Sequence, residues 1–412
     1  MKNHVSQLIM NLIKGTGFVF ICLLLSGSAL NAQEELYLKG VAELNKGKNI
    51  QAVESFSQIL SEKSGKVQIW LKRGEAYLEM KDYDRAIQDF NMANSIEPSI
   101  ASLWLSRCFA LTGEPEKAVR ALENHLRSVY KKSQKEILLD PAFLNLEKTR
   151  EWRNLWKTDW YKPYEYQKSE AAYQIQKDNY TKALENINIL LNQNEEDASL
   201  YYLRAQVYLA LKQYSKSLSD LERAINMETE KENFRLDRAE LYITMGHNNE
   251  ALQDYSYILD RQPEFFDLYI KRAKLLLSMQ KYDQALSDIE FYLGYFNEDI
   301  EAQYLGGMIN YSAGRYFDAL VYFNNTLEIG QDDKKYFIDR GNTFLKLHTY
   351  KYAVNDFSMA LDLDPQDSGV YLNRGIAHIR DNKSMKACYD FKKAFGMGER
   401  EALFYLQQYC NY

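Results

Sequence analysis

The sequence predicts an all-α fold: an α-solenoid, a right-handed superhelix of about ten helix pairs, with one atypical helical segment and a C-terminal capping helix. Three observations predict this fold. Small residues recur every 34 residues over most of the chain, and each is followed by a large apolar residue. Only six prolines occur in 412 residues, which favours long helices. The hydrophobic fraction of 46% is enough to form a large core.

The periodic pattern consists of three linked columns of residues. The first column contains small residues: Ala52, Ala86, Ala183, Ser217, Ala251, Ala285, Ala319, Ala353 and Ala387. An apolar or aromatic residue follows each of them by four positions, and an Ala or Gly precedes each by 12. Residues four apart share a helix face, so the small residue admits a neighbouring backbone and the large residue fills the space beside it. Each repeat should be two short helices that bury their apolar faces only by stacking on neighbours.

The motif within these copies resembles the tetratricopeptide repeat family. One copy carries, in order, Trp70, Gly74, Tyr77, Ala86, Phe90, Ala93 and Pro98. The resemblance covers residues 33–125, as repeats 1–3, and 164–398, as repeats 4–10. It implies a solenoid in which the first helix of each repeat faces inward, and it says almost nothing about function.

Residues 1–32 have the layout of a secretory signal peptide. Lys2 and Lys14 precede an apolar stretch, which small residues follow, and we expect cleavage after Ala32. Cys22 lacks the small preceding residue of a lipoprotein signal, so we expect no lipid anchor. The chain should be exported, to the periplasm or cell surface of a Gram-negative-type bacterium. The alternative is an uncleaved N-terminal helix that anchors the protein.

Charged residues are also in register with the repeat. Six copies place an Asp 16 residues after an Arg, and Arg107 alone has the Arg without the Asp. We interpret these residues as structural ion pairs between helices of the same or the adjoining repeat. The alternative is a row of charged ligand-binding residues.

The segment 126–163 departs from the repeat. It contains Trp152, Trp156 and Trp160, whose spacing of four predicts one stripe on a helix. One interpretation is an elongated helix pair whose tryptophans seal the joint between two blocks of repeats. The other is a docking patch for a partner, because Trp is a favoured interface anchor.

The last residues, 399–412, are predicted to form a single capping helix. Cys388 and Cys410 fall on helices that should pack together, and export would permit a disulfide between them. Two reduced, packed thiols are the alternative. Cys108 replaces a small residue of the repeat and is expected in the core.

No catalytic, metal or cofactor site is predicted. None of the five histidines has metal-ligand spacing, and neither a Gly-rich phosphate loop nor a nucleophile elbow occurs. The net charge of −6 argues against nucleic acid as a partner. We likewise expect no small-molecule substrate, and membrane contact only through an uncleaved N-terminus.

The inward face of the first helices is therefore the candidate binding surface. It should accept a peptide or an amphipathic helix. The candidate partner-binding residues are Tyr202, Ile270, Tyr304, Tyr311, Ile338 and Leu345. The resulting hypothesis is a non-catalytic protein-interaction scaffold of the cell envelope. The alternatives are a membrane-tethered assembly factor and an outer-membrane glycan-binding protein, although such glycan binders carry a lipidated Cys and a large insertion that this chain lacks.

The signal-peptide interpretation predicts a mature protein that begins at Gln33. N-terminal sequencing of the protein purified from its native cells checks this. Recovery of a chain that still carries Lys2 and the apolar stretch would establish the anchored alternative instead.

Overall fold

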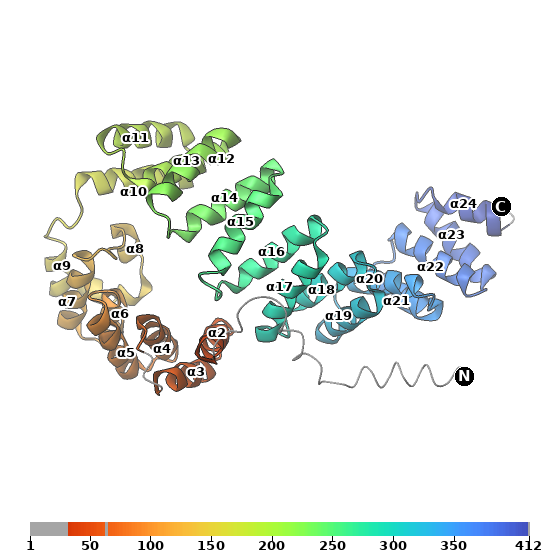
Figure 1. The fold of residues 1–412 in the computed structure, drawn as a ribbon, viewed down its shortest axis with the longest axis horizontal. Helices are drawn as coiled ribbons and strands as arrows, with labels where there is room; N and C mark the ends of the chain where they lie inside the picture. The colour runs from red at the N-terminus through yellow and green to blue at the C-terminus, as the bar shows by residue number, and fades with distance from the viewer. Residues whose placement is uncertain (1–31, 62–64, 411–412) are drawn as a thin grey trace. The chain divides into compact units, whose positions relative to one another are not determined.

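The computed structural model describes residues 32–61 and 65–410, so all of the predicted signal segment except Ala32 lies outside the described residues. Within the described ranges all regular structure is helical, which confirms the all-α solenoid class (Figure 1). The chain divides after Glu264 into two compact units. We call them the N-terminal unit (32–264) and the C-terminal unit (265–410).

The N-terminal unit contains six helix pairs, three on either side of the atypical segment. The first three pairs are α2 (Ala32–Asn45) with α3 (Asn49–Ser61), α4 (Val67–Glu79) with α5 (Tyr83–Ile96), and α6 (Ser102–Leu111) with α7 (Pro115–Leu126). The next three are α10 (Pro163–Gln176) with α11 (Tyr180–Gln193), α12 (Ala198–Ala210) with α13 (Tyr214–Met227), and α14 (Glu232–Met245) with α15 (Asn248–Leu259).

The C-terminal unit contains four helix pairs and one terminal helix. The pairs are α16 (Phe266–Ser278) with α17 (Tyr282–Tyr295), α18 (Ile300–Ser312) with α19 (Tyr316–Ile329), α20 (Lys334–Lys346) with α21 (Tyr350–Leu363), and α22 (Ser368–Arg380) with α23 (Ser384–Gly396). The terminal helix is α24 (Ala402–Tyr409), and Tyr405 stacks on Phe391 of α23 at 5.0 Å.

The two helices of a pair touch where a small residue faces a large one 16 positions later. A Cβ atom built on Gly341 would lie 2.8 Å from the ring of Phe357, and one on Gly375 would lie 2.5 Å from Phe391. The same contact, at 2.5–2.6 Å, joins Gly40 to Phe56, Gly74 to Phe90 and Gly307 to Phe323. No side chain fits there, so glycine lets the ring rest on the backbone of the first helix.

Repeats with alanine in place of this glycine carry a different partner. Ala171, Ala205 and Ala273 face Ile187, Leu221 and Ile289, which are all buried. The larger alanine is thus matched by a smaller partner than phenylalanine, so the combined side-chain volume stays close to that of the glycine–phenylalanine contact, as close packing requires. Ala239 faces Tyr255, which remains buried because its hydroxyl donates a hydrogen bond to Glu240 at 2.9 Å.

The six predicted Arg–Asp ion pairs form within repeats, which confirms their structural interpretation. Nε and Nη2 of Arg340 donate to the two carboxylate oxygens of Asp356, both at 2.8 Å. The same two-bond geometry joins Arg73 to Asp89, Arg204 to Asp220, Arg238 to Asp254, Arg272 to Asp288 and Arg374 to Asp390. Such two-pronged bonds fix the orientation of both side chains.

Four of these arginines also reach the preceding repeat. Nη1 of Arg340 donates to Asn324 of α19 at 2.8 Å, and Nη1 of Arg374 donates to Ser358 of α21 at 3.1 Å. Equivalent bonds join Arg73 to Ser57 at 3.0 Å and Arg204 to Asn188 at 2.9 Å. Each of these arginines therefore ties together three helices, and it sets the position of one repeat on the previous one.

The turn between the two helices of a repeat contains one residue in the left-handed backbone region. It is glycine at Gly246 (φ 78°) and Gly314 (φ 76°), but it is Lys212 (φ 57°) or His348 (φ 58°) in other repeats. A side chain at such a position costs roughly 1–2 kcal/mol. Stacking of the helix pair must therefore enforce these turns in the repeats that lack glycine.

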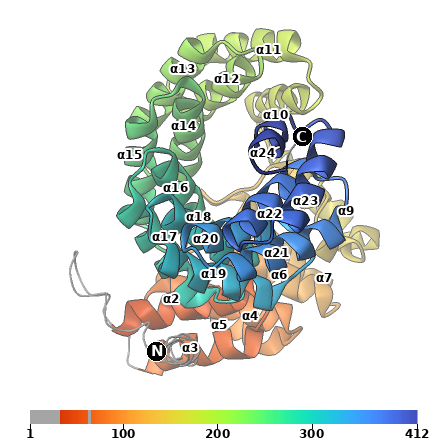
Figure 2. The ribbon, with the colours of Figure 1, turned by 90° about the vertical axis from the view of Figure 1, so that its right-hand side faces the viewer.

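Successive repeats bend toward their first helices. The first helices of neighbouring repeats approach each other more closely than the second helices do. In the N-terminal unit, Figure 2 shows α10, α12 and α14 on the inner side of the bend, with α11, α13 and α15 outside them. The first helices thus present an inner face, as the resemblance implied.

The expectation of an elongated helix pair in residues 126–163 is wrong. This segment contains the short helices α8 (Gln134–Leu138) and α9 (Arg150–Leu155), with two 3₁₀ turns, Pro141–Phe143 and Leu146–Lys148. Only Trp152 of the three tryptophans lies inside a helix. At the end of α9 the carbonyl of Leu155 accepts the backbone N–H of Thr158 at 3.2 Å and the indole N–H of Trp160 at 2.8 Å, in place of the backbone N–H that would continue the helix.

The cysteines take two different environments. Cys108 is completely buried, as expected. The structure joins Cys388 of α23 to Cys410, the residue after α24, by a disulfide with a Cα–Cα distance of 5.6 Å. This bond holds the terminal helix against the last repeat.

The glycine–ring contact makes a testable prediction about stability. Gly341→Ala should destabilise the protein by about 1–2 kcal/mol, because overpacking by the new methyl group outweighs the gain in helix propensity. Phe357→Leu should also destabilise, but the double variant should lose at least about 1 kcal/mol less than the sum of the two. Urea unfolding followed by circular dichroism measures all three.

Gly294→Ala in α17 is the matched control, because a Cβ atom there meets nothing within 4 Å. It should stabilise the protein by about 0.5–1 kcal/mol. Equal effects of Gly341→Ala and Gly294→Ala would contradict the packing account.

Candidate functional site: the inner face of the first helices

The structure brings four of the six predicted binding residues together. Tyr304 and Tyr311 lie on α18, and Ile338 and Leu345 lie on the adjacent α20. Tyr304, Ile338 and Leu345 pack on the edge of the core around Phe357, and all four remain partly exposed. Ile270 lies on α16 and is also partly exposed.

Tyr202 does not join this group, because it lies on α12 in the N-terminal unit. It occupies the same repeat position as Tyr304, and the two tyrosines make the same contact. The Tyr304 hydroxyl donates to Asp339 at 2.6 Å, and the Tyr202 hydroxyl donates to Asp237 at 2.8 Å. Each bond links the first helices of two successive repeats. The inner face of each unit therefore contains a Tyr–Asp bridge at this repeat position.

The two aspartates are functional candidates that sequence reasoning missed. Each follows its tyrosine by 35 residues, one more than the repeat length. The signal was the recurrence of the same Tyr and Asp three repeats apart. It was overlooked because acidic residues are common on the surfaces of helices.

The Asp339 carboxylate lies in an unfavourable environment. Burial raises its pKa above the ordinary value of 3.8, and hydrogen bonds from Tyr304 and Asn342 oppose this only in part. Lys335 lies one turn earlier, but its ammonium pairs with Glu301 at 3.2 Å and with Asp333 at 3.1 Å. Within the described residues, Asp339 has no ion-pair partner.

Amide side chains continue the polar line from Asp339. The Asn373 side chain on α22 donates to that of Asn342 on α20 at 3.4 Å. Amide groups of this kind can both donate to and accept from a peptide backbone. The inner face of the C-terminal unit thus combines a polar line with the apolar side chains of Ile338 and Leu345.

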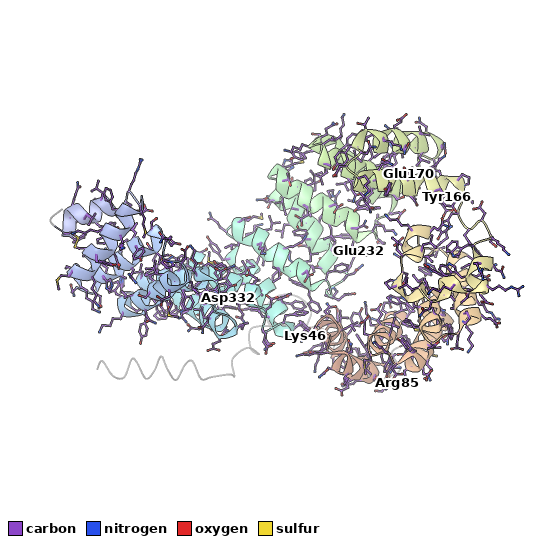
Figure 3. All side chains as sticks on the ribbon, turned by 180° about the vertical axis from the view of Figure 1, so that it is seen from behind. Lys46, Arg85, Tyr166, Glu170, Glu232 and Asp332 are labelled. Atoms are coloured by element: carbon purple, nitrogen blue, oxygen red, sulfur yellow. A yellow bond between two sulfur atoms is a disulfide. The ribbon has the colours of Figure 1, made fainter. Side chains whose placement is uncertain are left out.

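Two of the three tryptophans line a second surface feature, in the N-terminal unit. Trp152 is only 5% exposed and lies between Phe143 and Trp156, with ring centroids 5.5 and 5.6 Å away. Trp156 and Trp160 are partly exposed and, with Tyr166 of α10, line a hollow of about 220 Å³; Tyr166 is labelled in Figure 3. One ring thus lies in the core that α9 shares with α7, and two reach the surface; the docking-patch interpretation stays a prediction.

The atypical segment also completes the third repeat. Arg107, whose Asp is missing from α7, pairs instead with Asp140 of this segment at 2.6 Å. The segment therefore supplies the ion-pair partner that the repeat itself lacks. Sequence reasoning missed this pair because the partner lies outside the repeat register.

The part of the chain that the structure describes contains neither a candidate metal site nor a candidate membrane span. It holds no group of three His, Cys, Asp or Glu side chains that could bind a metal ion, and none of its helices is long and apolar enough to cross a bilayer. Burial lowers the pKa of His125 to about 4, and its Nε2 accepts a hydrogen bond from the Lys132 backbone at 3.0 Å. This histidine is a neutral core residue.

Comparison with family models agrees with the repeat geometry. Two models described as "Tetratricopeptide repeat" match the chain, one at residues 37–97 and 270–334 and the other at 198–230. The chain is a tetratricopeptide repeat protein. No curated protein sequence matches it.

Solved tetratricopeptide repeat structures resemble this protein in fold. The C-terminal part of a repeat-containing protein from Cytophaga hutchinsonii is 17% identical, with a TM-score of 0.51 over 57% of this chain and 98% of that one. A tetratricopeptide repeat protein from Parabacteroides merdae is 20% identical, with a TM-score of 0.43 over 60% and 97%. At these identities the likeness concerns the fold alone.

The environment of Asp339 predicts how stability depends on pH in this tetratricopeptide repeat protein. A carboxyl whose pKa is raised by folding binds its proton more tightly in the folded state, so stability falls as pH rises above about 4. Asp339→Asn removes this loss and can still accept the Tyr304 hydrogen bond. Urea unfolding between pH 4 and 7 should show the variant gaining stability over wild type as pH rises. An advantage for wild type that grows with pH would contradict this.

Proposed function

We propose that this tetratricopeptide repeat protein is a non-catalytic scaffold that binds a segment of another protein on the inner face of its first helices. Tetratricopeptide repeats generally mediate protein–protein interaction. The observation that carries the proposal is the inner face of the C-terminal unit, where partly exposed Tyr304, Ile338 and Leu345 flank the polar side chains of Asp339 and Asn342.

This combination suits a polypeptide guest. Apolar side chains of the guest would cover Ile338 and Leu345, which gives affinity through removal of apolar surface from water. The amides of Asn342 and Asn373 would pair with the guest backbone, which gives orientation. The Arg–Asp pairs below this face fix the spacing of successive first helices, so the surface is formed before the guest binds.

Export to the cell envelope is the second part of the proposal. The signal-like residues 1–32 support it, together with the Cys388–Cys410 pair, because disulfides persist in oxidising compartments. The periplasm or the cell surface would satisfy both observations. The membrane-tethered alternative differs only in whether the N-terminal segment is retained, and no feature of the described residues favours the glycan-binding alternative.

Photo-cross-linking in living cells tests the binding surface. A photoreactive phenylalanine analogue replaces Tyr304 on the inner face or Trp156 in the hollow, and Tyr389 is the control. Tyr389 is an aromatic residue of the same unit as Tyr304, 57% exposed on the second helix α23. We expect one protein to be captured repeatedly from Tyr304 and not from Tyr389. Capture from Trp156 alone would move the binding surface to the tryptophan hollow.

A further inference from the structure

The inner face of each unit carries one half-buried carboxylate that lacks a cation of its own. Within the described residues, neither Asp237 nor Asp339 has an ion-pair partner. Their basic neighbours are engaged elsewhere, because Arg238 pairs with Asp254 at 2.6 Å and Lys335 pairs with Glu301 and Asp333. Each carboxylate is held in place only by neutral donors, a tyrosine hydroxyl in both cases.

A neighbouring repeat contains a carboxylate that has both a tyrosine hydroxyl and a cation, although this carboxylate, Asp197, lies six residues before the position that corresponds to Asp237. Lys168 of α10 stands in the same repeat position as Tyr202 and Tyr304. Its ammonium lies 2.9 Å from the carboxylate of Asp197 at the start of the next repeat, and Tyr164 donates to the same oxygen at 2.9 Å. Here the chain itself supplies both the tyrosine hydroxyl and the cation. At Asp237 and Asp339 it supplies the tyrosine hydroxyl alone.

We propose that the guest supplies the missing cation: the inner face of each unit recognises a polypeptide segment with a Lys or Arg side chain, which pairs with Asp237 in the N-terminal unit and with Asp339 in the C-terminal unit. This inference rests on the proposed function and specifies the chemistry of the partner. A guest ammonium or guanidinium would donate charge-assisted hydrogen bonds to the open lone pairs of these carboxylates.

The energetics of the free protein support this assignment. A half-buried carboxylate without a cation destabilises the fold, and burial does raise the pKa of Asp339. Asparagine at this position would hold Tyr304 equally well without that cost. A residue that weakens the free protein but gains a charged partner in the complex is a feature of a binding site.

The tyrosine hydroxyls add specificity to this pairing. Each hydroxyl uses one carboxylate oxygen and fixes the rotation of the carboxyl group, so the remaining oxygen points in a defined direction. Tyr304 also packs against Tyr336 in a tilted arrangement, with ring centroids 5.2 Å apart, which restrains its own position. A guest cation would therefore meet a pre-oriented acceptor, which lowers the entropic cost of binding.

Matched peptides test the inference with the full-length chain. The probes are end-blocked nonapeptides of Ala and Leu whose central residue is Lys, Arg, Gln or Glu, and affinity is measured by fluorescence anisotropy. For wild type we expect the Lys and Arg peptides to bind about tenfold more tightly than the Gln peptide, as one partly desolvated ion pair allows. Asp237→Asn combined with Asp339→Asn should abolish that preference, so that the Lys, Arg and Gln peptides bind this variant with similar affinity.

Asp362→Asn is the control for long-range charge effects. Asp362 is exposed on the second helix α21, so its replacement changes the net charge of the same unit without touching the inner face. The preference for Lys and Arg should survive in this variant. Circular dichroism of every variant checks that it folds.

The outcomes separate the two proposals. If the Gln and Lys peptides bind wild type equally well, the cation inference is wrong and the inner-face function stands. A preference that the double Asp variant retains would also overturn the inference. If none of the peptides binds wild type, the proposed function itself fails.

Discussion

The contact between a small residue of the first helix and a large residue 16 positions later is the constraint on which the structure depends. Where the first residue is glycine, the ring of the second lies on the helix backbone itself, as Phe391 does on Gly375. Interiors pack to a nearly fixed density, so this contact fixes the distance and angle between the two helices. The nine helix pairs that carry this spacing have closely similar shapes, which lets them stack.

The position of one repeat on the next depends on a second interaction. This is the Arg–Asp ion pair, whose arginine makes a third hydrogen bond to the preceding repeat. The small-to-large contact and the Arg–Asp pair both lie between the two helices of a repeat, and the third bond of the arginine reaches the second helix of the preceding repeat. They leave most of the inner faces of the first helices uncommitted, apart from bridges such as those that Lys168, Tyr202 and Tyr304 make. Stability and binding are thus assigned to different surfaces of the same helices, and guest recognition can change without loss of the fold.

The sequence was sufficient for every feature that depends on local periodicity. The 34-residue columns placed Ala353, Phe357 and Gly341 in one contact, and the 16-residue spacing paired Arg340 with Asp356. Features set by the geometry between repeats were not predictable. The Tyr304–Asp339 bridge depends on the angle between α18 and α20, and the end of α9 depends on the indole of Trp160 returning to Leu155. The residues His348 and Lys212, in left-handed turns, show that stacking can override local preference.

The most direct test of the packing constraint is a ¹H–¹³C spectrum of the protein labelled at the glycine α-carbons. The position that a Cβ atom of Gly375 would occupy lies over the Phe391 ring, with three ring atoms within 3.1 Å, and an α-hydrogen occupies that direction. Its resonance should be shifted strongly upfield by the ring current and should return to the ordinary glycine region in Phe391→Leu. An ordinary Gly375 shift in the wild type, unchanged by that substitution, would contradict the account.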